Sequence, residues 1–563
     1  MSSQLNHILE RLNPGQLAAA TAESDTLVWA GPGSGKTQVA AGRAGWLIQT
    51  GRCLPHELLV VTFTNRAVNE FRQRLETMLG AALAGQIRVS TFHSLALSLI
   101  EMEGQLTSHD GSRRLRLISS EARQHLLEEL IEKTIKGQPN IAKDEYKTNT
   151  TQTRKQASEV GRLISQFKTD ADYQSQAEVG QEGDTATFSK IAEDSEPNHP
   201  LARAVYPYYR QHLSANRLLD LDDLIPHATT CLKTHPKLAR LPGVGVRQVL
   251  LDETQDTAPR QLELLLALMQ VSTQEQPGRS GNRLTPQLVA VGDERQQIFT
   301  YLHGGAYASL VQALPQPAQL HLEVQYRYGP TINRAAQSIS WHLGWEQITR
   351  PARLTDDPTR KYGGFLETTP TEVGHLPITV YEAEDEAEEG AFLVSEIRRM
   401  QKHLPQMTIA VLVRTHRQAH YLSQLFSADG LAYRFLNSNT EVEDGFEKKE
   451  ASGKPTSNPT EPPIQPNLPT PVIISTIHAA KGAEFEVVFV PGLTQGLFPV
   501  GPGRLLEDLR LFFVAITRAK YLLYLSYPLW VETSEHRYDR RKWVKPEEGQ
   551  RRLAPSSFLS ILP

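Results

Sequence analysis

A glycine-rich segment near the N-terminus has the residue types and spacing of a phosphate-binding loop. Apolar Leu27–Ala30 predicts a buried strand, Gly31–Gly35 a sharp turn, and Lys36–Thr37 the start of a helix. In such a loop backbone N–H groups and the helix N-terminus meet a polyphosphate, the lysine reaches its β- and γ-phosphates, and the threonine hydroxyl ligates Mg²⁺. We therefore expect a nucleoside triphosphate to be bound by Ala30, Gly31, Pro32, Gly33, Ser34, Gly35, Lys36 and Thr37.

Two adjacent carboxylates follow a later apolar run, Val246–Leu251, and so lie at a strand end. Asp252 is placed to hold Mg²⁺ through water, and Glu253 to orient and deprotonate an attacking water. Gln296, at the polar tip of the next apolar run, is placed to sense the γ-phosphate. Taken alone, the loop is compatible with an ordinary helix start and the carboxylates with a turn cap. Their joint occurrence favours a nucleotide site.

Strands alternate with helices in the first hundred residues, which predicts a parallel sheet. The runs Leu58–Asn65 and Ile87–His93 both end in polar residues, and ligands of such sheets collect beyond the carboxyl ends of the strands. Phe63 is equally compatible with a place in the core, and Tyr301 is placed to offer its ring to a nucleobase. We expect a ligand across the sheet to contact Thr62, Phe63, Thr64, Thr91 and His93.

Composition sets wider limits. A chain of 563 residues is long enough for several domains, and 39% hydrophobic with 22% charged residues is typical of globular proteins. The net charge of −4 argues against a wholly basic nucleic-acid binder and leaves room for a local basic groove. Cys53 and Cys231 lack the spacing of a zinc site or a disulfide framework. With no signal peptide or membrane-length apolar run, we expect a cytoplasmic protein.

Residues 96–215 are helical in pattern and charged, which predicts a helical insertion into the first α/β domain. Within it, the polar segment 175–200 predicts a mobile loop. The acidic stretch 219–224 fits a helix start better than a metal site. Gln16, which opens a short helix, is compatible with a surface position or with reading an adenine edge. The basic, aromatic stretch 537–545 fits a solvated face better than a phosphate track.

The ordered set of segments resembles the motifs of the UvrD/Rep/PcrA branch of superfamily-one DNA helicases over nearly the whole chain. The resemblance implies two RecA-like parallel-sheet motor domains of the P-loop NTPase class, with ATP and Mg²⁺ between them and single-stranded or tailed duplex DNA across both. It rests on AGPGSGKT (30–37), VTFTNRAVNEFRQRL (61–75), STFHSLA (90–96), LLDETQDT (250–257), VGDERQQIF (291–299), LEVQYRYGPTI (322–332), STIHAAKGAEFEVVFVPGL (475–493) and LRLFFVAITRAK (509–520).

The resemblance also implies roles for single residues. Tyr326 would stack on adenine, and Gln16 would belong to the same nucleotide site as part of the family's Q motif. Arg327 and Arg518 would be arginine fingers, worth about 10³–10⁵ in rate, although either alone is compatible with a surface ion pair. Glu484 would contact the ribose or link the two motor domains. DNA would be contacted by Phe63 and Tyr301 through bases, and by Thr64, Thr91, His93, Thr476 and His478 through the backbone.

The expected first motor domain covers 1–95 and 216–325, and the second covers 326–438 and 471–563. Between them in the chain, residues 439–470 are rich in Pro, Ser, Glu and Lys, so we expect a flexible linker where the family has its 2B subdomain.

Two smaller departures concern single positions. Leu302 and His303 replace the arginine that the family has before Gly-Ala, and Gln38 replaces an arginine after the phosphate loop.

The implied function is ATP-dependent movement 3′ to 5′ along single-stranded DNA with duplex unwinding, in DNA repair or replication. Two alternatives remain open from the sequence. One is a translocase that strips bound proteins and unwinds duplex poorly, and the other is an ATP-dependent nucleic-acid-binding scaffold. RNA is compatible with the same stacking and backbone contacts.

Overall fold

The structure is a computed structural model of the chain. It describes residues 9–10, 12–107, 115–137, 150–169, 199–241, 244–274, 285–298, 306–344, 350–351, 377–436, 469–532 and 550–563. The predictions for Tyr301–His303 and for segments 175–198, 439–468 and 537–545 lie outside these residues.

A six-stranded parallel sheet forms the centre of the first unit, in the order β3-β2-β6-β7-β1-β8. Its inner strands are apolar along their length because helices cover both faces. This confirms the predicted parallel sheet. The strands are β1 (Thr26–Ala30), β2 (Leu58–Thr62), β3 (Arg88–Thr91), β6 (Gln248–Leu251), β7 (Gln287–Gly292) and β8 (Ala318–Leu322).

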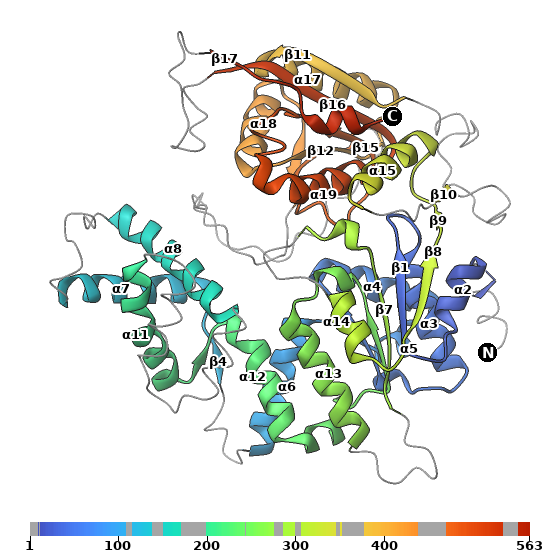
Figure 1. The fold of residues 1–563 in the computed structure, drawn as a ribbon, viewed down its shortest axis with the longest axis vertical. Coiled ribbons are helices and arrows are strands. Elements are labelled where there is room, and N and C mark those ends of the chain that lie inside the picture. The colour runs from blue at the N-terminus through green and yellow to red at the C-terminus, as the bar shows by residue number, and fades with distance from the viewer. Residues whose placement is uncertain are drawn as a thin grey trace.

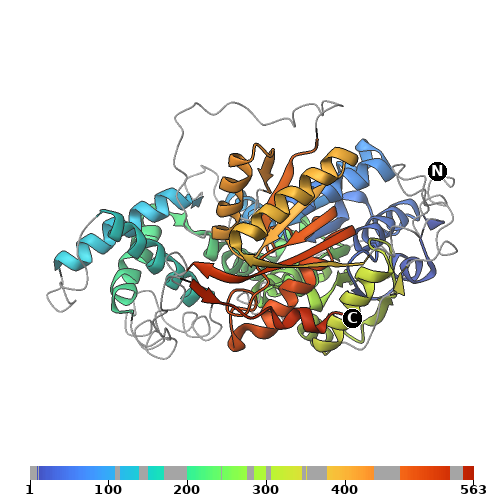
Figure 2. The ribbon, with the colours of Figure 1, turned by 90° about the horizontal axis from the view of Figure 1, so that it is seen from above.

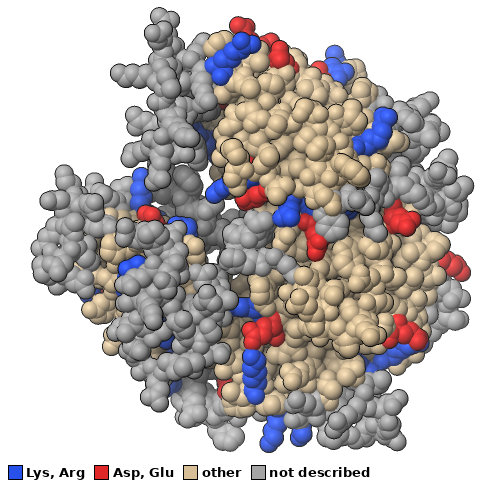
Figure 3. All heavy atoms as spheres, viewed as in Figure 1, with Lys and Arg blue, Asp and Glu red and all other residues tan. Residues whose placement is uncertain are grey.

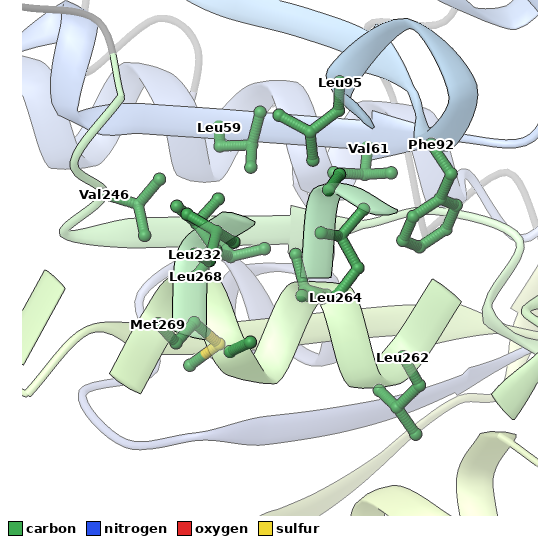
Figure 4. Packing of buried hydrophobic residues seen from close by; sticks show 14 of the residues in the cluster. Leu59, Val61, Phe92, Leu95, Leu232, Val246, Leu262, Leu264, Leu268 and Met269 are labelled. Atoms are coloured by element: carbon green, nitrogen blue, oxygen red, sulfur yellow. The ribbon is translucent and has the colours of Figure 1, made fainter. Parts of the chain in front are cut away.

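Each face of this sheet has its own buried cluster. The α3 cluster includes Val28, Leu58, Val60 and Leu250 and lies under α3 and α4. On the opposite face the α13 cluster includes Leu59 and Val61, whose side chains meet those of the covering helices (Figure 4). The helices of this unit are α2 (Pro14–Ala20), α3 (Lys36–Gln49), α4 (Asn65–Leu79), α5 (Ala81–Ala84), α6 (Phe92–Thr107), α12 (Leu221–Thr234), α13 (Pro259–Gln274) and α14 (Ala306–Ala313), with short 3₁₀ turns η1 (Pro55–Glu57), η2 (Pro236–Arg240), η3 (Thr254–Asp256) and η4 (Glu294–Gln296).

Helix α6 begins earlier than the sequence pattern suggested. Strand β3 ends at Thr91, so the prediction that His93 lies on this strand is wrong: His93 sits in the first turn of α6. The helix packs Leu95, Leu99 and Ile100 into the α13 cluster. The core of the first unit therefore continues beyond residue 95, where we expected the helical insertion to begin.

A separate helical unit stands to the side of the two sheets in both ribbon views (Figures 1 and 2). It consists of α7 (Ser120–Gly137), α8 (Thr150–Thr169) and α11 (Pro200–Asn216), which share a buried core containing Ile131, Ile164 and Tyr206. Two short parallel strands, β4 (Arg116–Leu117) and β5 (Leu218–Leu219), pair at its base.

A buried ionic network joins the helical unit to the first unit. Asp220 caps α12 by accepting from the Asp223 backbone N–H at 3.1 Å, which confirms the predicted helix start. Its other oxygen accepts from Lys168 Nζ of α8 at 2.7 Å and from the Tyr209 hydroxyl at 2.9 Å. Within the described residues, no group of three or more His, Cys, Asp or Glu side chains is arranged to hold a metal ion.

The second unit is built on a seven-stranded sheet, in the order β11-β16-β15-β12-β14-β13, with β17 antiparallel on β16. The remaining pairs are parallel. This completes the two predicted α/β domains, which lie one above the other in Figure 1. The strands are β11 (Thr379–Asp385), β12 (Ile409–Val413), β13 (Tyr433–Phe435), β14 (Val472–Thr476), β15 (Phe485–Val490), β16 (Ala519–Glu532) and β17 (Gln550–Arg552).

Helices cover this second sheet on both faces too. Buried clusters on its two sides include Phe512 and Phe558 on one and Phe426 and Phe489 on the other. The covering elements are α15 (Pro330–His342), α17 (Glu386–His403), α18 (His416–Ala428), α19 (Leu505–Ile516), η6 (Pro502–Arg504) and η7 (Ser557–Ile561); the small pair β9 (Val324–Gln325) and β10 (Arg350–Pro351) precedes and follows α15. None of the described helices is both long and apolar enough to span a membrane.

Replacing Lys168 by Met should destabilise the helical unit. Asp220 is 1% exposed, and losing its ion-pair partner leaves a buried carboxylate poorly compensated, at a cost of about 3–5 kcal/mol. We expect faster amide hydrogen exchange in α8 and α11 and a lower melting temperature. Lys133→Met is the control, because its pair with Glu129 is solvent-exposed and such pairs contribute little to stability. Equal effects of the two substitutions would contradict this account.

Candidate active site

The phosphate loop connects β1 to α3, as predicted. Gly33 (φ 71°) and Gly35 (φ 85°) adopt left-handed conformations that other residues rarely take. A Cβ at Gly33 would lie 2.5 Å from the Cβ of Arg327, and one at Gly35 would lie 2.6 Å from Gln16 Nε2. Both glycines are therefore required by backbone conformation and by the close approach of other segments.

Gln16 and Tyr326 hold the loop from outside. Gln16 is 2% exposed and donates from Nε2 to the Ser34 carbonyl at 2.8 Å, so the alternative of a plain surface position is wrong. Asn13, which caps α2, donates to the Tyr326 hydroxyl at 2.7 Å, and the Tyr326 backbone N–H donates to the Gly33 carbonyl at 2.8 Å. The two residues expected near adenine are thus joined to the loop and to each other through Asn13.

The predicted carboxylate pair follows β6 and faces the loop lysine. Asp252 continues the ladder by donating its N–H to the Val61 carbonyl at 2.9 Å, and Glu253 turns the chain with a left-handed backbone (φ 50°). Lys36 Nζ donates to the Ala30 carbonyl at 3.2 Å, and its positive charge favours the ionised form of both carboxyls.

The two carboxyls differ in their tendency to ionise. Burial and the charge of Glu253 raise the pKa of Asp252 to about 7. Burial also raises the pKa of Glu253, but Lys36 and Lys481 outweigh that effect and lower it to about 2. Glu253 is therefore ionised at neutral pH, as a general base must be.

The residues predicted to hold Mg²⁺ suit that ion. Asp252 Oδ1 is buried and has no hydrogen-bond partner among the described residues. Mg²⁺ prefers oxygen ligands and usually takes only one or two from the protein, completing its shell with phosphate oxygens and water. The Thr37 hydroxyl as a direct ligand, with the Asp252 carboxylate accepting from a water of the shell, would match this requirement in type and number.

Gln255 positions the expected general base, a role that the sequence analysis missed. Its Nε2 donates to Glu253 Oε2 at 2.6 Å, and its Oε1 accepts from the Asp293 backbone N–H at 2.9 Å. Gln255 therefore ties the end of β6 to the end of β7. An amide that can donate and accept at once, two residues after the expected general base, is the signal that would have found it.

Arg518 reaches the site from the second unit. It is 1% exposed and donates to Gln296 Oε1 at 2.9 Å, to the Val514 carbonyl at 3.0 Å and to the Ala483 carbonyl at 3.2 Å. Burial and repulsion by Arg327 lower the pKa of Arg518 to about 9, so it stays charged at neutral pH. The alternative of a surface ion pair is wrong for Arg518, and the structure brings it into direct contact with the predicted γ-phosphate sensor.

Arg327 lies beside the phosphate loop just before α15. Its Nε donates to Glu484 Oε2 at 3.0 Å and its Nη1 to the Thr517 carbonyl at 3.0 Å. Glu484 also pairs with Lys520 at 2.6 Å, and although burial opposes its ionisation, these two cations lower its pKa to about 2. Glu484 therefore anchors Arg327 to the second unit.

Two further cationic side chains make contacts across the junction of the two units. Lys481, from the loop after β14, contacts the Asp256 carboxylate and donates to the Gln296 carbonyl at 2.7 Å. Arg295 pairs with Asp293 at 2.7 Å and lies 5.4 Å from the centre of the Phe513 ring on α19. Charged side chains of both signs accordingly lie along the line where the two units meet (Figure 3). The sequence analysis assigned no role to Lys481 or Arg295.

Of the residues expected to contact DNA, those that the structure describes lie at or just beyond the carboxyl ends of strands in both sheets. Phe63 is half-buried and packs against the core of the second unit, so it is part of the contact between the two units. Three threonine hydroxyls cap local turns: Thr64 accepts from the Ala67 N–H, Thr91 from the Ser94 N–H and Thr476 from the Ala479 N–H.

The two histidines expected on the DNA track are largely neutral at pH 7. Burial lowers the pKa of His93 despite the opposing charge of Asp222. Burial and nearby Arg414 and Lys481 lower the pKa of His478 to about 4. Both would meet DNA as hydrogen-bonding groups rather than as cations.

Arg518→Ala should slow ATP hydrolysis by about 10³-fold or more if Arg518 has the arginine-finger role that the resemblance implies, that of a cation meeting charge that grows on the transferring phosphoryl group. The steady-state rate of phosphate release by the variant and by the unaltered chain measures this effect. Arg504→Ala is the control, since Arg504 is exposed and lies in η6 of the same unit. A folded Arg518→Ala protein that hydrolyses ATP within tenfold of the unaltered chain would contradict the assignment.

Comparison with known proteins agrees with this geometry. The chain matches the family model of the UvrD/REP helicase N-terminal domain over residues 12–314 and that of the UvrD-like helicase C-terminal domain over 320–450 and 461–529. It is 26% identical over 547 residues to a probable DNA helicase of Mycoplasma pneumoniae, covering 95% of this chain and 87% of the relative. It is 27% identical over 432 residues to the ATP-dependent DNA helicase PcrA of Leuconostoc citreum and 25% identical over 436 residues to that of Staphylococcus aureus. These alignments cover 75% and 77% of this chain but 49% and 52% of the relatives, so the chain spans about half the length of the PcrA proteins. The chain belongs to the UvrD/REP helicase family.

Proposed function

We propose that this protein is a DNA-stimulated ATPase that moves 3′ to 5′ along single-stranded DNA and unwinds duplex DNA ahead of it. The observation that carries the proposal is the contact between Gln296 at the end of β7 and Arg518 of the second unit. The residue predicted to sense the γ-phosphate and a buried cation from the opposite unit meet at 2.9 Å. Nucleotide state can therefore alter how the two units fit together.

Each residue at the junction has a part in hydrolysis under this proposal. The loop N–H groups and Lys36 bind the β- and γ-phosphates, and Glu253, held by Gln255, accepts a proton from the attacking water. Thr37 and Asp252 hold Mg²⁺, which neutralises phosphate charge when bound. Arg327 and Arg518 stabilise the charge that develops on the transferring phosphoryl group.

Movement along DNA follows if the two units hold the strand alternately. Phe63, Thr64, Thr91 and His93 belong to the first unit, while Thr476 and His478 belong to the second. We propose that both groups contact one strand, with Tyr301 as an additional stacking residue. Closing on ATP and opening after hydrolysis would then change the spacing of the two groups along the strand. The 3′-to-5′ direction and a place in DNA repair or replication are part of the proposal, supported by family membership.

A helicase of this polarity should unwind a duplex that carries a 3′ single-stranded tail and leave one with a 5′ tail intact. Lys36→Ala should abolish unwinding, because Lys36 is the phosphate-binding lysine of the loop. Gel separation of labelled strands in the presence of ATP and Mg²⁺ measures the outcome.

Two results would contradict the proposal in different ways. Unwinding from 5′ tails would reverse the polarity. Movement on single strands without unwinding of either substrate would point to a translocase that displaces bound proteins.

A further inference from the structure

Thr62, the last residue of β2, has a buried hydroxyl that the site described above does not use. The side chain is 1% exposed. Its Oγ1 has no hydrogen-bond partner among the residues that the structure describes. A buried hydroxyl without a partner costs about 1–3 kcal/mol. A valine of the same shape would fill this position without that cost.

Strand alternation places the Thr62 side chain on the face of the sheet that α3 covers. Side chains alternate between the two faces of a strand. Leu59 and Val61 point into the α13 cluster (Figure 4), whereas Leu58 and Val60 belong to the α3 cluster. Thr62 continues the second series, and α3 begins at Lys36 and Thr37.

The register of β2 and β6 brings Thr62 beside Asp252. Val61 pairs with Leu251, and the Asp252 N–H donates to the Val61 carbonyl. Asp252 follows Leu250 by two residues, and Leu250 belongs to the α3 cluster, so Asp252 faces α3 as well. Neighbouring strands lie roughly 4.8 Å apart. The Thr62 hydroxyl and the Asp252 carboxylate therefore lie side by side on the face of the sheet that α3 covers, and Thr37 is in the first turn of α3. Thr62 Oγ1 and Asp252 Oδ1 are both buried and have no hydrogen-bond partner among the described residues.

We propose that the Thr62 hydroxyl hydrogen-bonds a water molecule of the Mg²⁺ shell, beside the water through which Asp252 holds the ion. Mg²⁺ usually keeps several of its waters in protein sites, and a metal-bound water donates hydrogen bonds that a buried hydroxyl oxygen can accept. Thr62 is thus a positioning residue for the metal. The inference rests on the proposed ATPase function. Because Phe63 follows directly, the same strand end joins the metal to the expected DNA track.

The test compares Thr62→Val with Thr62→Ser in the full chain. The readout is the binding of a fluorescent ADP analogue at increasing Mg²⁺, without DNA and without turnover. For Thr62→Val we expect a rise of about tenfold in the Mg²⁺ concentration that gives half of the maximal Mg²⁺-dependent increase in nucleotide binding. This rise is equivalent to one lost hydrogen bond of about 1.4 kcal/mol. Metal-free nucleotide binding should be unchanged. Thr62→Ser, which keeps the hydroxyl, should stay within about twofold of the unaltered protein.

Thermal unfolding supplies the second readout. Since valine removes an unsatisfied buried hydroxyl, Thr62→Val should melt at the same temperature as the unaltered chain or higher. Thr494→Val is the matched control: Thr494 is 0% exposed and its hydroxyl also lacks a described partner, but it lies in the second unit after β15. Thr494→Val should change the melting temperature in the same direction as Thr62→Val and leave the Mg²⁺ dependence of nucleotide binding unchanged.

Several results would overturn the inference. The inference fails if nucleotide binding by Thr62→Val depends on Mg²⁺ as it does in the unaltered chain. It also fails if the Val and Ser variants both need the same higher Mg²⁺ concentration. A Thr62→Val protein that melts well below the unaltered chain would show that the hydroxyl has a structural partner instead. These outcomes are distinct from failure of the proposed function, which would appear as no binding of Mg²⁺-nucleotide by the unaltered chain.

Discussion

The junction of the two units depends on burying the guanidinium of Arg518, a charge that has to be satisfied within protein. Moving a cation out of water costs several kcal/mol unless hydrogen bonds and opposite charge compensate it. Arg518 obtains acceptors from the preceding helix α19, from the loop before β15 and from Gln296 of the first unit. The last of these exists only while the two sheets are in the observed arrangement, so the packing of the units and the state of the nucleotide site are physically linked.

The surrounding side chains reinforce that link. Lys481 contacts Asp256, Arg295 lies over Phe513, and Glu484 holds Arg327 beside the phosphate loop. On the first unit, Gln255 connects Glu253 to the end of β7, the strand after which Gln296 follows. A change at the γ-phosphate position would thus reach the second unit through hydrogen bonds and ion pairs. The first-unit partners follow the carboxyl ends of β6 and β7, where such sheets bind ligands, whereas Glu484 and Arg518 of the second unit directly precede β15 and β16.

Much of this arrangement could be predicted from the sequence, because the strong signals are local. The apolar runs before Gly31 and Asp252 indicated strands. The polar residues that follow these runs indicated the edge of the sheet at which the site lies. The first turn of α6 was assigned to β3, since Phe92 is as apolar as a strand residue and helix starts carry little periodic signal. Gln16 was ambiguous because its burial comes from contacts with the distant phosphate loop. Gln255 was missed although its partners lie within the first unit, whereas Arg295 and Lys481 were missed because their contacts with Phe513 and Asp256 are set by how the units pack. The implied roles of the DNA-track residues and of both arginines as fingers are still predictions.

The central claim is that a strand laid across both units changes the geometry at their junction and so the rate of ATP cleavage. The most direct measurement is the steady-state rate of phosphate release by the purified chain at saturating ATP and Mg²⁺, with and without single-stranded oligonucleotide. The account predicts a rate that rises by at least tenfold and saturates with oligonucleotide. A rate that is the same in the presence and absence of oligonucleotide would contradict it.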